Sequence, residues 1–321
     1  FWTEFKRSSY IDFYEHYDGP MFARIRHIQD LIIDNAVFDD LLSYLYYPSP
    51  YCFDVIPLKS ISDIYDLFLG YHLEYDDSGI LENVLKSEFR KSNGAVTTPE
   101  HIVHNTIDST VPSEYLQSLT NQQILDLKFL DPACGSGVFL VSIYDHLATQ
   151  IESNIEERKD VLPHRYLYEK DGKKYLNLEG RKLIVNQCLH GVDINQECVE
   201  VAKLSLSLKI IDGFEPIDFN NAGLYGSQIL HGVGVNIKCG NSLVEPDILE
   251  RFSCISENLE ELAATNVFDY KTAFCDIFSR GGFDYVIGNP PYVEVKNYNV
   301  ALPCMSAYIK QRYGSSRNGK I

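Results

Sequence analysis

The sequence predicts an α/β protein built on a Rossmann-like, doubly wound and mostly parallel sheet, with a helical region before it. From about residue 124 onward, segments with strand character alternate with segments of helical period. Each strand segment runs directly into a turn of small or polar residues. Alternating strands and helices form parallel sheets whose ligands bind beyond the carboxyl ends of the strands, so these turns predict a site at that edge.

The elements of the sheet can be placed in order along the chain. Strands are expected at 124–130, 188–194, 235–243 and 283–292, with helices at 138–151 and 195–211. Asn195 is expected to cap the second helix. A polar insertion, 152–187, separates the first two strand–helix units and contains EKDGKKY, in which Asp-Gly predicts a tight turn.

The first part of the chain is expected to form a helical region over residues 1–92. Stretches such as FARIRHIQDLIIDNAVFDDLLSYLY and SISDIYDLFLGYHLEY space apolar residues by three and four. No reactive group of residues stands out there, so the region is interpreted as packing. The second domain is expected over 93–321. Near its start, Thr98 is expected to be the N-cap of a helix whose first residue is Pro99.

Composition limits the possible function classes. No apolar run has membrane-spanning length, and no secretory signal pattern occurs. The eight cysteines include no CxxC pair, which disfavours zinc and redox sites and fits single thiols in a reducing cytoplasm. The net charge of -17 repels nucleic acid, although residues 295–321 carry five basic residues and no acid.

The turn from Asp131 to Gly137, DPACGSG, predicts a ligand site that does not bind phosphate. Its glycines allow a ligand to approach the backbone closely. Their spacing differs from GxGxxG, and no Walker lysine follows, which disfavours phosphate. The acid at the end of the strand suits a ligand that bears an ammonium group.

Asp193 ends the second strand, where the ribose-binding acid of a Rossmann-type unit belongs. It lies 56 residues past Gly137 instead of roughly 20, and the insertion accounts for the excess. An acid that only caps the following helix is the alternative. Together the two turns indicate a nucleoside with a cationic amino-acid tail, which describes S-adenosylmethionine better than NAD.

The segment GNPPY, 288–292, closes the fourth strand with two prolines. Proline cannot continue a sheet ladder, and the residue before each proline is held in an extended conformation. Asn289 and Tyr292 are therefore expected at fixed positions on the sheet edge, where they predict a further part of the site.

The motifs DPACGSG, GVDI, GNSL and GNPPY, preceded by GAVTTP, resemble the ordered motifs of amino-group DNA methyltransferases. The chain is most similar to the N6-adenine class of type IIG restriction–modification enzymes. The resemblance implies the class I S-adenosylmethionine-dependent methyltransferase fold, with S-adenosyl-L-methionine as cofactor and double-stranded DNA with a flipped adenine as partner. The alternatives are a protein-glutamine or rRNA methyltransferase, an NAD-dependent oxidoreductase and a catalytically idle binding module.

The resemblance assigns catalysis to Asn289, Pro290, Pro291 and Tyr292. Hydrogen bonds from the adenine amine to the Asn289 side-chain oxygen and the Pro290 carbonyl would favour a pyramidal nitrogen, which attacks the sulfonium methyl in line. Positioning and electrostatics would supply most of the rate effect. Tyr292 is the expected stacking platform for the flipped base.

The resemblance also assigns cofactor contacts. Asp193 is expected to hold the ribose hydroxyls, Ile194 to pack on the adenine ring, and Asn241 to contact the adenine amine, where many relatives carry Asp. The methionine part is expected to lie among Thr98, Asp131, Ala133, Gly135 and Gly137. No metal site is predicted.

The chain ends 29 residues after Tyr292, whereas the family continues with further core strands and a target-recognition domain. The resemblance therefore implies a catalytic core without that domain, from a protein in which a nuclease can be fused upstream. On its own, this core is expected to be a poor or inactive methyltransferase.

Overall fold

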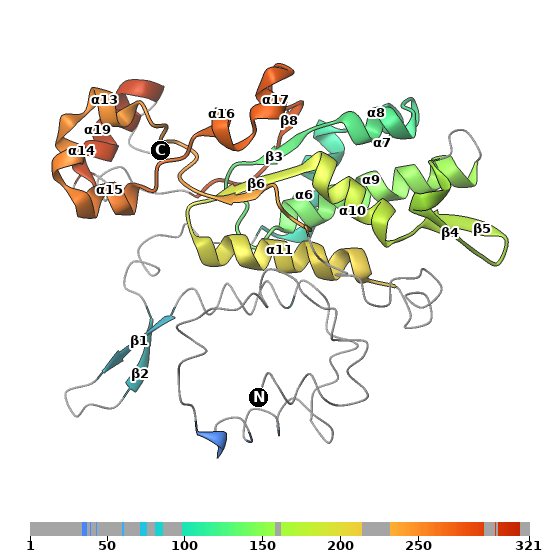
Figure 1. Ribbon diagram of the computed structural model, residues 1–321, viewed down its shortest axis with the longest axis horizontal. Coiled ribbons are helices and arrows are strands. Elements are labelled where there is room, and N and C mark those ends of the chain that lie inside the picture. The colour runs from blue at the N-terminus through green and yellow to red at the C-terminus, as the bar shows by residue number, and fades with distance from the viewer. Residues whose placement is uncertain are drawn as a thin grey trace.

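The computed structural model of the chain describes residues 34–36, 39, 43, 60, 71–75, 81–85, 98–157, 162–213, 232–291, 299 and 301–314. At its centre lies a sheet of four parallel strands in the order β7-β6-β3-β8 (Figure 1). The strands are β3 (Phe129–Asp131), β6 (Leu189–Asp193), β7 (Ile237–Cys239) and β8 (Tyr285–Val286). The four predicted strands are therefore all present, and the predicted parallel sheet is confirmed.

Helices cover both faces of this sheet, which confirms the doubly wound arrangement. One face packs against α9 (Val138–Glu156), α10 (Leu178–Cys188) and α11 (Gln196–Ile211). The other face packs against α16 (Tyr270–Ala273) and α17 (Cys275–Ser279), as Figure 1 shows. Successive side chains of a strand point to opposite faces of the sheet, so each strand contributes to both helical layers.

Alternation along β3 and spacing along α9 explain this packing. Phe129 faces the α9 layer, and Leu130 faces the α17 layer. On α9, the fully buried residues recur at intervals of three or four, as one face of a helix requires: Leu140, Ile143, Leu147 and Ile151. Each such side chain contributes about 1.5–3 kcal/mol by leaving water, so this stripe is the main attachment of α9.

The first predicted strand begins later than expected. Residues 124–126 belong to α8 (Asn121–Asp126), which follows α7 (Ser113–Gln117). The hydroxyl of Thr120 accepts a hydrogen bond from the Gln123 N–H, and the Gln123 side chain accepts one from the Thr120 N–H. This capping box starts a helix before the apolar pair of residues 124 and 125, and the strand is left with three residues.

The helix that follows Thr98 also differs from the expectation. The helix α6 runs over Glu100–Thr110, and its N-cap is Pro99, which makes no side-chain cap hydrogen bond. The prediction of Thr98 as the N-cap is therefore wrong by one position. Its hydroxyl remains available for another partner.

The polar insertion contains the predicted Asp-Gly turn. A 3₁₀ turn (His164–Tyr166) leads into the hairpin of β4 (Leu167–Lys170) and β5 (Lys173–Leu176). Asp171 and Gly172 both have positive φ, 54° and 75°, as a two-residue hairpin of type I′ requires. The flanking helices α9 and α10 extend into the predicted insertion from both sides.

The N-terminal region departs from the all-helical expectation. An antiparallel pair, β1 (Tyr71–Tyr75) and β2 (Leu81–Leu85), occupies part of it. The predicted helical stretch that ends at residue 75 is thus wrong for its last five residues, where Tyr71, Leu73 and Tyr75 recur with the period of a strand. Most of residues 1–92, and the predicted domain boundary at 92–93, lie outside the described residues.

Four helices near the C-terminus form a separate cluster, which we call the C-terminal module. They are α13 (Ile248–Arg251), α14 (Ser253–Glu257), α15 (Leu259–Thr265) and α19 (Pro303–Tyr313). Their apolar core includes Ile248, Met305 and Tyr308. A disulfide joins Cys254 to Cys304, so the expectation of single thiols is wrong for this pair.

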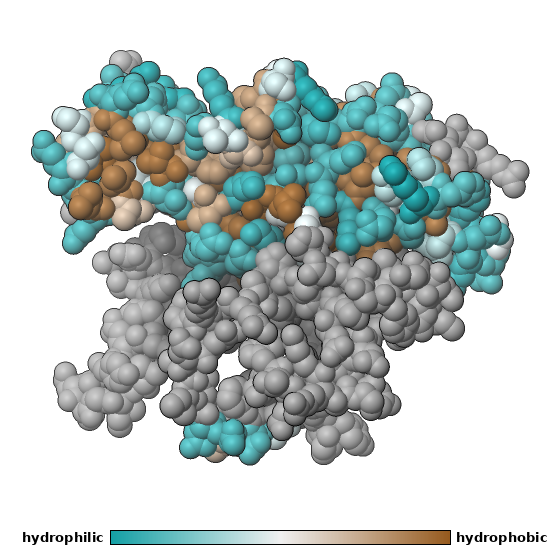
Figure 2. Space-filling view, viewed as in Figure 1, coloured by the Kyte–Doolittle hydropathy of each residue, from teal (hydrophilic) through white to brown (hydrophobic). Residues whose placement is uncertain are grey.

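The surface of the described residues is mixed in character. Hydrophilic side chains dominate the view in Figure 2, and apolar side chains gather over the C-terminal module. There Leu249 and Leu259 are exposed by 43% and 73%. Within the described part of the chain, no helix has both the length and the apolar character needed to cross a membrane.

Candidate functional site

The carboxyl ends of the four strands bring the predicted site residues together on one edge of the sheet. We call this the sheet-edge site: the turns that follow β3, β6, β7 and β8, together with Thr98. All predicted site residues lie in it and are described except Tyr292, which lies outside the described residues.

The turn after β3 is held by its own acid and by β6. The N–H of Ala133 donates to Asp131 Oδ1 at 3.0 Å, and the N–H of Cys134 donates to the Val192 carbonyl at 3.0 Å. The N–H of Gly135 donates to Asp193 Oδ2 at 2.9 Å. The first two turns are therefore joined through the Asp193 carboxylate.

The two glycines of this turn have different surroundings. Both have positive φ, 51° at Gly135 and 89° at Gly137, a backbone conformation that residues other than glycine seldom adopt. A Cβ at Gly137 would lie 3.2 Å from Ala202 of α11, so this glycine serves helix packing. A Cβ at Gly135 would meet no atom within 4 Å, so its backbone lies beside open space.

Asp193 makes two main-chain hydrogen bonds and caps no helix. Besides Gly135, its carboxylate accepts from the Asn195 N–H at 2.9 Å. The N-cap of α11 is Asn195, whose side chain accepts from the Glu197 N–H, as the sequence predicts. Burial is the main cause of a raised pKa of Asp193. Next to it, the side chain of Ile194 is 50% exposed.

Asp131 lies beneath the turn and is only 1% exposed. Burial raises its pKa to about 7, and the negative charge of Asp193 adds to this effect. Its carboxylate also lies under the last strand: a Cβ at Gly288 would be 2.3 Å from Asp131 Oδ1. Gly288 is therefore required for the close approach of the turns after β3 and β8.

Asn241, after β7, is buried and makes hydrogen bonds inside the protein. Its Oδ1 accepts from the Leu243 N–H at 3.0 Å, and its Nδ2 donates to the Met305 sulfur at 3.5 Å. The neighbouring Ser242 hydroxyl donates to the Pro132 carbonyl, which joins the third turn to the first. Local sequence patterns give no signal for this contact, because the two residues are 110 positions apart.

Asn289 stands exposed at the end of β8. The N–H of Ile287 donates to the Leu130 carbonyl at 2.9 Å, which fixes the strand just before it. The Nδ2 of Asn289 donates to Thr98 Oγ1 at 3.0 Å, across 191 residues of sequence. Pro290 and Pro291 follow and are exposed.

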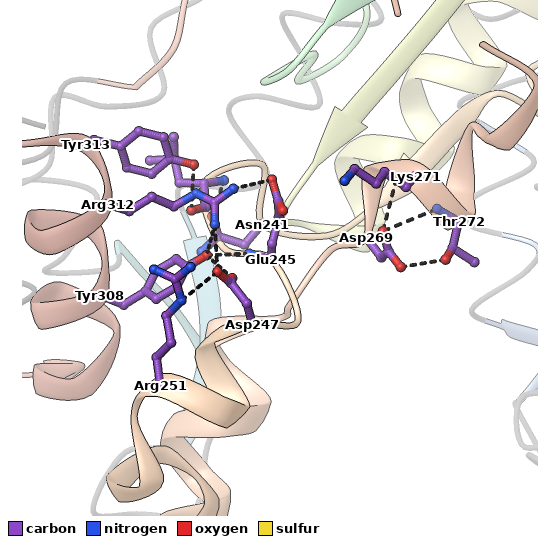
Figure 3. A network of polar contacts seen from close by, with 11 residues as sticks. Asn241, Glu245, Asp247, Arg251, Asp269, Lys271, Thr272, Tyr308, Arg312 and Tyr313 are labelled. Carbon is purple, nitrogen blue, oxygen red and sulfur yellow. Dashed lines mark hydrogen bonds and ion pairs between the residues drawn. The ribbon is translucent and has the colours of Figure 1, made fainter. Parts of the chain in front are cut away.

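Behind the turn after β7, charged side chains tie the C-terminal module to the sheet. Arg312 forms ion pairs with Glu245 at 2.7 Å and Asp247 at 2.9 Å, and the Tyr308 hydroxyl donates to Asp247 (Figure 3). The Tyr313 hydroxyl donates to the Leu243 carbonyl. Arg312 belongs to the basic stretch of 295–321, so part of that charge is balanced by acids of the same chain.

Comparison with known proteins identifies what this chain is similar to. Residues 187–321 match the family model described as Eco57I restriction-modification methylase. The chain is 26% identical over 307 residues to the type II restriction enzyme and methyltransferase RM.Eco57I of Escherichia coli, covering 94% of this chain and 28% of that protein. It is 24% identical over 225 residues to the adenine-specific methyltransferase PglX of Streptomyces coelicolor, covering 68% of this chain and 16% of that protein.

A solved structure is also similar: the type IIL restriction-modification enzyme MmeI in complex with DNA, with a TM-score of 0.49 and 15% identity. That match covers 98% of this chain and 38% of MmeI. The match to the Escherichia coli relative covers 28% of that protein, so this chain spans less than a third of its length.

Proposed function

Because residues 187–321 belong to the Eco57I restriction-modification methylase family, we propose that the sheet-edge site methylates DNA. The reaction is transfer of a methyl group from S-adenosyl-L-methionine to the N6 amine of adenine, in the modification part of a restriction–modification enzyme. One observation carries the proposal: the exposed Asn289 amide stands at the same edge as the turns after β3 and β6. The similarity to an adenine-specific methyltransferase supports adenine as the target.

The turns fit this cofactor. The open space beside Gly135 leaves room for a ligand against the backbone, and the exposed Ile194 offers an apolar surface to an adenine ring. Asp193 is proposed to hold the ribose hydroxyls, and Asp131 to favour the ammonium group, whose positive charge would stabilise the ionised form of this buried carboxyl. The remaining proposed contacts are Thr98, Ala133 and Gly137 for the methionine part and Asn241 for the adenine amine. When bound, the cofactor supplies an electrophilic methyl group.

Asn289 and Pro290 are proposed to prepare the target amine. The lone pair of an exocyclic adenine amine is conjugated into the ring, which makes the nitrogen a weak nucleophile. The Asn289 side-chain oxygen and the Pro290 carbonyl accept its two N–H groups and favour a pyramidal nitrogen. Neither group titrates near neutral pH, so the effect is one of positioning and electrostatics.

The target adenine must leave the DNA duplex to reach this edge of the sheet. Tyr292 follows the two prolines directly, and its ring is proposed as the surface on which the flipped base stacks. Residues 93–321 are proposed as the catalytic domain, with double-stranded DNA as the partner.

Labelled methyl transfer in the intact protein tests the proposal. We expect label from S-adenosyl-L-methionine to enter duplex DNA and to be recovered as N6-methyladenine. Recovery as N4-methylcytosine, or labelling of protein glutamine or rRNA in place of DNA, would contradict it. Calorimetry on the same protein should show binding of S-adenosyl-L-methionine and no binding of NAD.

A further inference from the structure

Thr98 has a hydroxyl that its own helix does not use. It precedes α6, and Pro99 occupies the N-cap position without a side-chain hydrogen bond. The Thr98 hydroxyl oxygen instead accepts the Nδ2 hydrogen bond of Asn289 at 3.0 Å. A threonine that the local sequence predicts as a cap is thus committed to a residue 191 positions away.

In this bond the donor end of the Asn289 amide faces the Thr98 hydroxyl. An asparagine side chain has a donor end and an acceptor end of nearly equal shape, and a rotation of 180° about χ2 exchanges them. When the Asn289 nitrogen donates to Thr98, the oxygen points to the other side. In the exchanged orientation, an NH₂ group would meet an incoming amine, donor against donor.

The surroundings leave Asn289 few other restraints. Its side chain is exposed, and among the described residues its only side-chain hydrogen bond is the one to Thr98. The main chain before it is fixed by the Ile287–Leu130 hydrogen bond and by the tight contact of Gly288 with Asp131. The backbone position of Asn289 is therefore set by β3 and β8, whereas the hydrogen bond to Thr98 is the one contact among the described residues that holds its amide.

We propose that Thr98 is a positioning residue that orients the Asn289 amide so that its oxygen faces the target amine. This inference rests on the proposed function, because it assigns Thr98 a task in preparing the nucleophile. Thr98 lies in GAVTTP and Asn289 in GNPPY, so the bond would couple these two motifs directly. A contact between Thr98 and the methionine part of the cofactor would not by itself give this coupling.

The test compares Thr98→Val, Thr98→Ser and Thr98→Ala in the intact protein. Removing the hydroxyl should lower kcat for DNA methylation, measured at saturating S-adenosyl-L-methionine, about tenfold, the scale of one net hydrogen bond. Thr98→Ser should restore kcat to within about twofold of the original protein, which separates the hydroxyl from the methyl group. Thr106→Val is the matched control, because the Thr106 hydroxyl bonds only to the Ile102 carbonyl of α6 within the described residues.

A double-mutant cycle with Asn289→Ala gives the decisive result. If Thr98 acts through Asn289, Thr98→Val should have no further effect on the residual activity of Asn289→Ala. A further tenfold loss in that background would overturn the inference, as would unchanged kcat or a fall in cofactor affinity alone. Should Thr98→Val fail to fold, the comparison of Ser with Ala carries the test. Absence of any methyl transfer to adenine by the unsubstituted protein would instead refute the proposed function.

Discussion

The sheet-edge site and the C-terminal module are joined to the same sheet by different kinds of interaction. The turns of the site are held by main-chain N–H groups, by Asp131 and Asp193, and by close backbone approach. The module is held by an apolar core and by charged side chains, chiefly Arg312 and Glu261. The site thus leaves the exposed Asn289 amide for a ligand, whereas the module uses its charges internally.

The two regions also meet. The module helix α19 begins 14 residues after Asn289 in the sequence, and its Met305 contacts the Asn241 side chain. Substitutions in the site should therefore change the reaction, and substitutions in the module should change stability first. Substitutions in both regions test that division, and those at the reacting atom should be the most damaging.

Asn289→Ala should have the largest effect. Loss of a preorganised polar group at the reacting atom lowers turnover about a hundredfold or more. Affinity for S-adenosyl-L-methionine should change far less, because the substituted side chain faces the base. Steady-state methyl transfer and calorimetry measure the two quantities. Asn105→Ala, an exposed position on α6, is the control and should leave both unchanged. Equal loss of cofactor binding in Asn289→Ala would break the division.

The raised pKa of Asp131 should appear in the dependence of stability on pH. Its folded pKa is raised from 3.8 to about 7, so between these values the folded protein holds a proton that the unfolded chain has lost. The stabilising contribution of the neutral acid is complete below the unfolded pKa and is lost as the pH rises through about 7. The loss is on the order of a few kcal/mol. Urea unfolding from pH 4.5 to 8 should show a flatter profile for Asp131→Asn, and an unchanged slope would contradict the burial effect.

Gly288→Ala should damage the contact between two turns of the site. The new methyl group would lie 2.3 Å from Asp131 Oδ1, so the turn or the strand end must move. Overpacking of this kind costs about 1–3 kcal/mol. Methyl transfer and thermal unfolding should both decline. A second substitution, Asp131→Ser, shortens the opposing side chain and should recover part of the stability; no recovery would place the strain elsewhere.

Glu261→Ala should loosen α19, which contacts the site through Met305 and Asn241. The Glu261 side chain is 3% exposed, and its Oε1 accepts from the N–H groups of Cys304 and Met305 at 2.7 and 3.0 Å. The Glu261 carboxylate therefore caps the N-terminus of α19, where the N-cap residue Leu302 makes no side-chain hydrogen bond. Its loss should lower the free energy of unfolding by about 1–2 kcal/mol. Glu260→Ala, at an exposed neighbouring position, should have little effect.

Arg312→Met should have the smallest effect. Its ion pairs with Glu245 and Asp247 are partly exposed, with 27% of the Arg312 side chain accessible, so water screens them. We expect a loss of about 0.5–1 kcal/mol in low salt that shrinks in 1 M salt. Arg280→Met, exposed at the end of α17, is the control. A loss that persists in high salt would show that the arginine stem contributes by packing.

The succession of the strands along the chain and the positions of the turns could be predicted because both are local patterns. A short apolar run that ends in DPACGSG or GNPPY identifies a strand end without any knowledge of its neighbours. The prediction failed at residues 124–126 because a short apolar run fits a helix or a strand equally well. It failed at 71–75 because the alternation of Tyr71, Leu73 and Tyr75 was included in the preceding helical pattern. At 124–126, the capping box of Thr120 and Gln123 was the signal that would have decided the matter.

The contacts between distant segments could not be predicted. Thr98 meets Asn289 across 191 residues, and Arg312 meets Glu245 across 67 residues. Such pairs depend on how the strands are ordered in the sheet and on how α19 returns to it. The same limitation explains why Thr98 was predicted as a helix cap and why the Cys254–Cys304 disulfide was not expected.

The position of β3 between β6 and β8 has a consequence for how the chain folds during synthesis. β3 pairs with β6 across 60 residues, through Phe129 and Leu189, but with β8 across 156, through Phe129 and Tyr285. At about 5–20 residues per second, the ribosome needs roughly 5–20 seconds to extend the chain from Leu189 of β6 to Tyr285 of β8. The half of the sheet that carries Asp131 and Asp193 can therefore pair while the Asn289 segment is still untranslated. During that interval one edge of β3 lacks its native partner, and an unpaired strand edge is where a nascent chain is most exposed to wrong pairing.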